Sequence, residues 1–185
     1  GDPDVLKSEK LYWIVDPIDG TYNYLRSIPG VCVSIALMKG WNPVVGAIYD
    51  FTRGELFAGG KDLPLTLNGA EITPAWASEV GQAVLMTGFP SATDYSSENL
   101  SKFVMSAQKF KKVRMCGSAA LAMAWVACGR ADSYKESRLY LWDVAAGLSL
   151  MESARAAYEL TPLKIKEKPF CIEIRAAKNR EFFVD

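Results

Sequence analysis

The residues best suited to chemistry are aspartates in two short motifs. Asp16 and Asp19 lie three residues apart in the sequence DPIDGT, directly after the apolar run 11–15. Asp143 lies in the sequence WDVAAG. A turn stiffened by proline can direct both carboxylates of the first motif at one point. Each motif alone is more typical of capping, because aspartate often caps turns and helix starts.

Together the two motifs indicate a site for a metal and a phosphate. Three carboxylates that converge in a partly buried place repel one another by about 4 kcal/mol per pair at about 4 Å, so they require a cation. The motifs offer only oxygen donors, which favour Mg²⁺, with Mn²⁺ or Ca²⁺ as substitutes. The N–H groups of Gly20 and Thr21, at the start of a predicted short helix, can bind a phosphate beside that ion. This combination predicts phosphoryl transfer.

The composition excludes several other functions. The chain has no histidine, which excludes Ser-His-Asp and Cys-His catalysis and HExxH zinc sites. Its 21 basic residues balance 21 acidic ones, so no overall field favours nucleic acid or an anionic membrane. No charge-free stretch reaches the roughly 20 residues of a membrane helix, and no signal peptide is visible. The four cysteines are widely spaced, which is typical of reduced thiols in a cytoplasmic protein.

The first half of the chain is predicted to be mainly antiparallel sheet. The run 11–15 has the character of a strand buried on both faces. The runs 31–38, 44–49 and 55–58 continue from it as an antiparallel meander.

The second half mixes strands and helices. Strands are expected at 82–87, 113–116, 132–135 and 169–174. A helix begins at Ser96 or Ser97, and its apolar residues share one face: Leu100, Phe103, Val104, Ala107 and Phe110. Ser118 is the predicted cap of an alanine-rich helix that Gly129 ends. Asp143 stands where an N-cap belongs, before a helix whose small residues allow close packing.

These elements predict an α/β (α+β) fold, a layered sandwich of two sheets. We expect a single domain over residues 1–185. Its first lobe, 1–88, is expected to be mainly antiparallel sheet, and its second lobe, 89–185, to be α/β.

The pair of motifs, WIVDPIDGT at 13–21 and WDVAAG at 142–147, resembles the signature of the inositol monophosphatase family. That family belongs to the lithium-sensitive, magnesium-dependent phosphatase superfamily. The resemblance continues between the motifs and covers nearly the whole chain, through 31–35, 45–49, 67–69, 117–121 and 129–134. It implies an αβαβα sandwich of the sugar phosphatase type, usually a homodimer, and in-line attack of a metal-activated water on a phosphomonoester.

The resemblance also implies roles for individual residues. Asp16 would bridge two metals and the Ile18 carbonyl would bind one of them, while Asp19 and Asp143 would hold the other. Thr21 would help to polarise the attacking water, and the amides of Gly20 and Thr21 would hold the phosphate. The substrate hydroxyls would face a further set of residues: Asp19, Gly117, Ser118, Ala119 and Glu136. Glu136 suits this role chemically, because a carboxylate accepts hydrogen bonds from a polyol, although a solvated acid at a strand end fits the pattern equally well.

One part of the family pattern is missing. Family members carry an N-terminal segment that supplies a glutamate ligand from a Gly-Glu-Glu motif and an aspartate that partners the threonine. The acids before Asp16 are Asp2, Asp4 and Glu9, and none lies in such a motif. We expect a fragment of a longer product, in preference to a diverged protein, and the chain alone is not expected to be fully active. Without the N-terminal helices, an apolar face should be exposed, which favours a tight oligomer.

The function expected first is Mg²⁺-dependent hydrolysis of a small polyol phosphomonoester, inositol monophosphate above all. A related phosphatase of fructose 1,6-bisphosphate, histidinol phosphate or a nucleotide 3'-phosphate is an alternative. A non-catalytic protein that binds a metal or a sugar phosphate is another. In a fourth alternative, the aspartates only cap helices in an oligomerisation domain.

Overall fold

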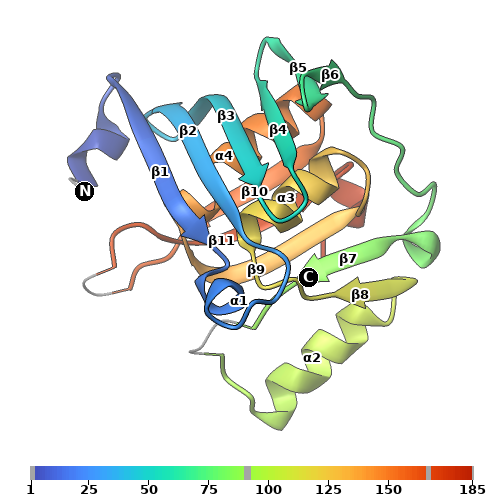
Figure 1. Cartoon of the computed structure of the whole chain (residues 1–185). Helices are drawn as coiled ribbons and strands as arrows, with labels where there is room; N and C mark the ends of the chain where they lie inside the picture. Colours follow the sequence, from blue (N-terminus) through green and yellow to red (C-terminus); the bar gives the residue numbers. More distant parts are fainter. Residues whose placement is uncertain (1–2, 90–92, 166–167, 185) are drawn as a thin grey trace.

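The computed structural model describes residues 3–89, 93–165 and 168–184, and it contains two sheets with buried helices between them (Figure 1). Sheet A is antiparallel and follows the chain order: β1 (Leu11–Asp19), β2 (Cys32–Lys39), β3 (Asn42–Asp50), β4 (Glu55–Gly60), β5 (Leu63–Leu67) and β6 (Ala70–Glu71). The predicted meander is therefore confirmed, and the hairpin of β5 and β6 extends it.

Sheet B has the order β10-β11-β9-β7-β8. Its strands are β7 (Val84–Thr87), β8 (Lys112–Arg114), β9 (Ser133–Tyr140), β10 (Ala157–Pro162) and β11 (Cys171–Ala177). β7 pairs in parallel with β8 and β9, while β11 pairs antiparallel with β9 and β10. The mixed α/β class predicted from the sequence is confirmed.

Four α-helices are described: α1 (Thr21–Leu25), α2 (Ser97–Ala107), α3 (Ala119–Ala127) and α4 (Leu141–Ala154). Three short 3₁₀ helices occupy Pro3–Lys7, Val80–Gln82 and Arg180–Phe182. α3 and α4 form the layer between the sheets, and nearly every residue of α3 is buried. Within the described residues, no helix combines the length and apolar character that crossing a membrane would demand.

Small residues let α4 lie close to its neighbours, as the sequence predicted. A Cβ atom at Gly147 would lie 2.4 Å from the Cβ of Met123 on α3. On the opposite side, a Cβ at Gly46 of β3 would lie 2.7 Å from the carbonyl oxygen of Ala146. Because real Cβ atoms do not approach so closely, glycine is required at both contacts. This packing fixes α4, and with it Asp143, against sheet A.

The prediction that β1 is buried on both faces is wrong. Tyr12 and Ile14 pack against the core, but Leu11, Trp13 and Val15 are 60%, 65% and 51% exposed. The helix layer covers only the inner face of sheet A, and no described element covers the outer one. We call this surface the outer face of sheet A; it continues over the other strands through Ile35, Tyr49 and Leu56. The apolar face expected from the sequence is therefore present.

Asp143 is not the N-cap of its helix. α4 begins at Leu141, so Asp143 is the third helical residue, and its Oδ2 accepts a hydrogen bond of 2.8 Å from the Tyr140 N–H. The carboxylate still satisfies a free backbone donor at the helix start, but from inside the first turn.

Several predicted strand ends also shift. The strand expected at 82–87 begins at Val84, because residues 80–82 form a 3₁₀ turn. The strand expected at 113–116 is found at Lys112–Arg114, and that at 169–174 is found at Cys171–Ala177. The short strand expected at 132–135 runs on to Tyr140, which brings Glu136 into the middle of β9.

Ser96 caps α2 as predicted, since its Oγ accepts from the Asn99 N–H. The apolar face of α2 is only partly covered, and Leu100 and Val104 remain 38% and 57% exposed. A cavity of about 750 Å³ separates this helix from β7 and β9.

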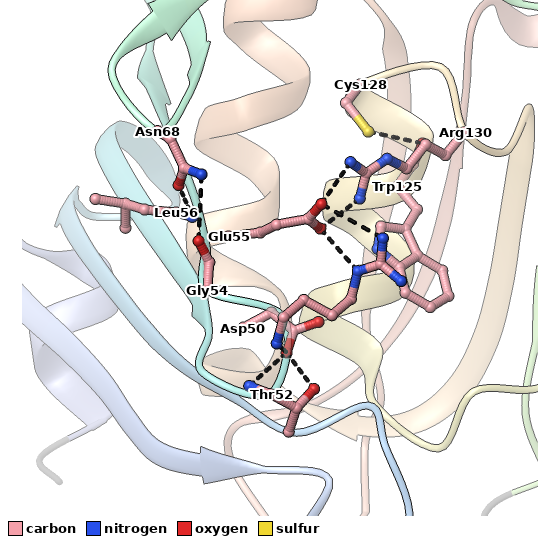
Figure 2. Close-up of polar contacts among 10 residues, drawn as sticks. Asp50, Thr52, Gly54, Glu55, Leu56, Asn68, Trp125, Cys128 and Arg130 are labelled. Carbon is pink, nitrogen blue, oxygen red and sulfur yellow. Dashed lines mark hydrogen bonds and ion pairs between the residues drawn. The ribbon is translucent and has the colours of Figure 1, made fainter.

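An ion cluster ties sheet A to the helix layer (Figure 2). Glu55 on β4 accepts two hydrogen bonds from Arg130, of 2.6 and 2.8 Å, and two from Arg53, of 3.1 and 3.4 Å. The hydrogen bonds from Arg130, followed by those from Arg53, lower the pKa of Glu55 to about 2. Arg130 follows α3 in the chain, so this contact joins segments that are far apart in sequence.

Candidate metal centre and substrate cavity

The two aspartate motifs meet at one end of sheet A. Asp16 and Asp19 lie at the end of β1, and Asp143 lies in the first turn of α4. Each offers a carboxylate oxygen, and these three oxygens lie within 4.8 Å of one another. We call these three residues the acidic triad. The two motifs therefore come together in space, as the sequence predicted.

The acidic triad is electrostatically strained without a cation. Burial first, and then the neighbouring charges of Asp19 and Asp16, raise the pKa of Asp143 to about 7, against the hydrogen bond from the Tyr140 N–H. Burial also raises the pKa of Asp19 and of Asp16, against hydrogen bonds that favour their ionised forms. A divalent cation would remove both the repulsion and the cost of burial. Because the ligand atoms are all carboxylate oxygens, the triad fits a hard ion such as Mg²⁺, Mn²⁺ or Ca²⁺.

Asp19 is held in place from two sides. Its Oδ2 accepts hydrogen bonds from Ser118 Oγ at 2.6 Å and from the Ala120 N–H at 2.8 Å. Its Oδ1 accepts from the Gly20 N–H at 2.8 Å. Ser118 is the N-cap of α3, as predicted, since its Oγ also accepts from the Leu121 N–H. The carboxylate of Asp19 therefore rests at the start of α3, where the helix dipole favours a negative charge.

The turn after Asp19 places the other residues of the first motif. Thr21 Oγ1 donates a hydrogen bond of 2.9 Å to the carbonyl of Ile18, the predicted backbone ligand. Gly20 has a φ of +81°, and a Cβ there would lie 2.5 Å from the Gly30 carbonyl oxygen, so no other residue fits. The Gly20 N–H, predicted to bind phosphate, donates its hydrogen bond to Asp19 Oδ1 in this structure.

A cavity of about 630 Å³ opens beside the acidic triad. It is lined by Asp19 and Asp143 together with all the residues expected to face substrate hydroxyls: Gly117, Ser118, Ala119 and Glu136. Its size is in the range of small-molecule sites. Of the other predicted residues, Asp16 reaches the acidic triad through its carboxylate. Ile18 precedes Asp19 at the end of β1, and Gly20 and Thr21 follow Asp19 at the start of α1.

Glu136 is a cavity residue and not a solvated acid at a strand end. It accepts a hydrogen bond of 3.0 Å from the Tyr134 hydroxyl. Burial raises its pKa to about 7, which the Tyr134 hydrogen bond opposes. A Cβ at Gly88 would lie 2.4 Å from Glu136 Oε2, so glycine at position 88 leaves room for this carboxylate.

Some cavity residues were not predicted from the sequence. Asn23, Ile28, Phe89 and Leu139 also line it. Asn23 Nδ2 donates to the Gly30 carbonyl at 2.9 Å and to the Cys116 carbonyl at 2.7 Å. Its proximity to the first motif was the only available signal, because its partners are backbone atoms that any sequence would offer.

Comparison with known proteins decides the family. Residues 1–160 match the model of the inositol monophosphatase family. The chain belongs to the inositol monophosphatase family. It is 39% identical over 148 residues to the protein named Nus factor SuhB of Xylella fastidiosa, and the matched region covers 80% of this chain and 54% of that protein. It is 36% identical over 157 residues to inositol-1-monophosphatase of Synechocystis, covering 83% of this chain and 55% of that protein.

Solved structures of the inositol monophosphatase family share the fold. Inositol monophosphatase from Anabaena has a TM-score of 0.79 and 37% identity, with 94% of this chain and 69% of that chain covered. SuhB from Mycobacterium tuberculosis has a TM-score of 0.79 and 29% identity, with 90% and 66% covered. The chain spans about half the length of the curated relatives it matches. The inositol monophosphatase family is metal-dependent, and the acidic triad of this member can hold a divalent ion.

Proposed function

We propose that this chain contributes the metal-binding and substrate-binding centre of a Mg²⁺-dependent phosphatase. Its substrate would be a small polyol phosphomonoester, inositol monophosphate above all. One observation carries the proposal: the acidic triad opens on the same cavity as Glu136 and the loop at the start of α3. One substrate molecule in this cavity would then contact both the metal site and Glu136.

Each residue has a role in this proposal. Asp16, Asp19 and Asp143 would hold Mg²⁺, with the Ile18 carbonyl as a further ligand. When bound, the ion supplies charge neutralisation at the phosphate and activation of water. Thr21 would orient the water, and the amides of Gly20 and Thr21 would hold the phosphate.

The substrate hydroxyls would be bound on the other side of the cavity. Glu136 would accept hydrogen bonds from them, because it is half-buried and its carboxylate can accept more hydrogen bonds than the one from Tyr134. Gly117, Ser118 and Ala119 would face the ring, since their small side chains leave the cavity open. Because Glu136 carries a raised pKa, a neighbouring cation would favour its ionised, accepting form.

The test is phosphate release from inositol 1-phosphate by the longest gene product that contains this chain. We expect release that needs Mg²⁺, is inhibited by Li⁺, and falls at least about 100-fold in Asp143→Asn. The matched control is Asp62→Asn, an exposed aspartate in the turn between β4 and β5. Release that persists in a chelator, or that survives Asp143→Asn, would contradict the proposal. Parallel assays with fructose 1,6-bisphosphate, histidinol phosphate and adenosine 3'-phosphate would identify the preferred substrate.

The proposal includes a cytoplasmic homodimer. The outer face of sheet A supports self-association, because it presents contiguous apolar side chains. Four free cysteines support a reducing compartment. Sedimentation at several protein concentrations would test the dimer, and fractionation of the source cells would test the location.

A further inference from the structure

Three glycines meet behind the cavity, each in a backbone conformation that other residues avoid. Gly20, Gly30 and Gly117 have φ values of +81°, +99° and +74°. A Cβ at Gly20 would lie 2.5 Å from the Gly30 carbonyl oxygen, and a Cβ at Gly30 would lie 3.2 Å from the Cys116 carbonyl oxygen. Three chain segments therefore touch at backbone distance: the turn that ends the first motif, the segment before β2, and the loop before α3.

Asn23 lies at the centre of this contact. Its Nδ2 donates one hydrogen bond to the Gly30 carbonyl at 2.9 Å and another to the Cys116 carbonyl at 2.7 Å. A Cβ at Gly117 would lie 3.0 Å from both terminal atoms of the Asn23 side chain, so glycine there makes room for the amide. An amide nitrogen carries two hydrogens, and both are directed at carbonyls of other segments.

We propose that Asn23 is a positioning residue that sets the width of the substrate cavity. One wall of the cavity is the metal-binding turn, which continues into α1 and Asn23 itself. The opposite wall is the loop of residues 116–119, and Asn23 holds that loop through the Cys116 carbonyl. This inference rests on the proposed function, because it describes how the same site is held ready for substrate.

The acidic triad does not depend on Asn23. Asp16 is held by the Ile18 N–H, and Asp143 is held by the Tyr140 N–H. Asp19 keeps the Gly20 N–H and the Ala120 N–H, and its third donor, Ser118 Oγ, stays fixed to α3 because it also caps that helix through the Leu121 N–H. Loss of the Asn23 amide should therefore weaken the binding of an inositol phosphate, whose ring would lie against residues 117–119, while the affinity for a metal ion is kept.

The test compares Asn23→Leu with Asn68→Leu. Leucine is similar in size to asparagine, carries no charge and donates no hydrogen bond. Asn68 is a suitable control because it also bridges backbone groups, through the Gly54 carbonyl at 3.2 Å and the Leu56 N–H at 2.7 Å, but in a turn of sheet A. Calorimetry would measure the affinity for Mn²⁺, and then for inositol 1-phosphate at saturating Mn²⁺.

We expect Asn23→Leu to weaken the binding of inositol 1-phosphate at least tenfold and to change Mn²⁺ affinity less than threefold. In the active gene product, KM should rise about tenfold with kcat changed less than threefold. Asn68→Leu should change none of these values, although both variants should lower the thermal midpoint of unfolding because each loses hydrogen bonds to the backbone. Unchanged affinity for inositol 1-phosphate in Asn23→Leu would overturn the proposal, and so would an equal loss of Mn²⁺ and inositol 1-phosphate binding.

A second measurement does not depend on metal or activity. Amide hydrogen exchange at residues 116–119 should be at least tenfold faster in metal-free Asn23→Leu than in the wild type, with exchange in β3 unchanged. Equal exchange at 116–119 in both proteins would overturn the proposal. Absence of Mn²⁺ binding in the wild type would instead contradict the proposed function, so the two failures can be told apart. If Asn23→Leu does not fold, Asn23→Ser replaces it, since a serine hydroxyl is too short to reach both carbonyls.

Discussion

Ser118 Oγ donates a hydrogen bond of 2.6 Å to Asp19 Oδ2 and itself accepts one from the Leu121 N–H. One side chain thus caps α3 and orients a member of the acidic triad. The link joins the two halves of the chain at the metal centre, because Asp19 ends β1 and Ser118 begins α3.

Ser118→Ala should therefore affect both stability and metal binding. Loss of the cap should lower the free energy of unfolding by about 1 kcal/mol. Loss of the hydrogen bond should raise the pKa of Asp19 further and weaken Mn²⁺ binding about tenfold, as measured by calorimetry. Ser96→Ala is the matched control, since Ser96 caps α2 away from the centre. A Mn²⁺ affinity in Ser118→Ala equal to that of the control would show that the Gly20 and Ala120 amides suffice to orient Asp19.

Asp143→Asn should stabilise the protein in the absence of metal. The change removes a buried charge close to Asp16 and Asp19, while the amide oxygen can still accept from the Tyr140 N–H. We expect the thermal midpoint in a chelator to rise by at least about 3 °C. In the wild type, Mn²⁺ at about 100 times its Kd should add about 2.7 kcal/mol of stability, and this gain should be lost in the variant. A lower midpoint in the chelator would argue against repulsion within the acidic triad.

Glu136 should make the metal-free protein less stable as the pH rises. Its pKa is raised from 4.5 to about 7, so the folded state binds the proton more tightly than the unfolded state. The stabilisation is complete below about pH 4.5 and is lost as the pH rises through about 7. The loss is at most about 3 kcal/mol. Unfolding by urea from pH 4.5 to 8 should show this slope, and Glu136→Gln should reduce it. The exposed Glu71→Gln serves as the control, and an equal slope in both variants would contradict the assignment.

The ion cluster around Glu55 should protect the fold against acid. Because the pKa of Glu55 is lowered to about 2, its contribution is present above about pH 4.5 and is lost as the pH falls toward 2. Arg130→Gln should cost about 1 kcal/mol at pH 7 and should reduce the loss of stability in acid. Arg53→Gln should cost less, because Arg53 lies in the same turn as Glu55 and joins no distant segments. Equal effects of the two variants would show that the link to α3 contributes nothing.

The convergence of the acidic triad could be predicted, because its residues lie in short motifs. Asp16 and Asp19 lie at the end of an apolar strand, and Asp143 lies in the first turn of a helix of small residues, so both elements could be assigned locally. Whether the two motifs meet in space depends on the topology of the whole fold, and the family resemblance was the main reason to expect that they do. The roles of the site residues and the boundary between the two lobes stay predictions.

Other features could not be predicted, for physical reasons. The apolar run at β1 is the same whether one face or both are covered, so the exposure of Trp13 depends on what packs against the sheet. The position of Asp143 within its helix depends on which residue begins α4, and a sequence pattern fixes a helix end only to within a residue or two. Asn23 acts on backbone carbonyls, which leave no mark in the sequence.

The outer face of sheet A determines how stability measurements on this protein must be compared. Anything that binds to this face favours the folded state, since the unfolded chain does not present it as one surface. If the binder is another molecule of the protein, the thermal midpoint rises with concentration. Two variants studied at different concentrations could then differ for reasons unrelated to their substitutions, so a dilution series belongs with every comparison.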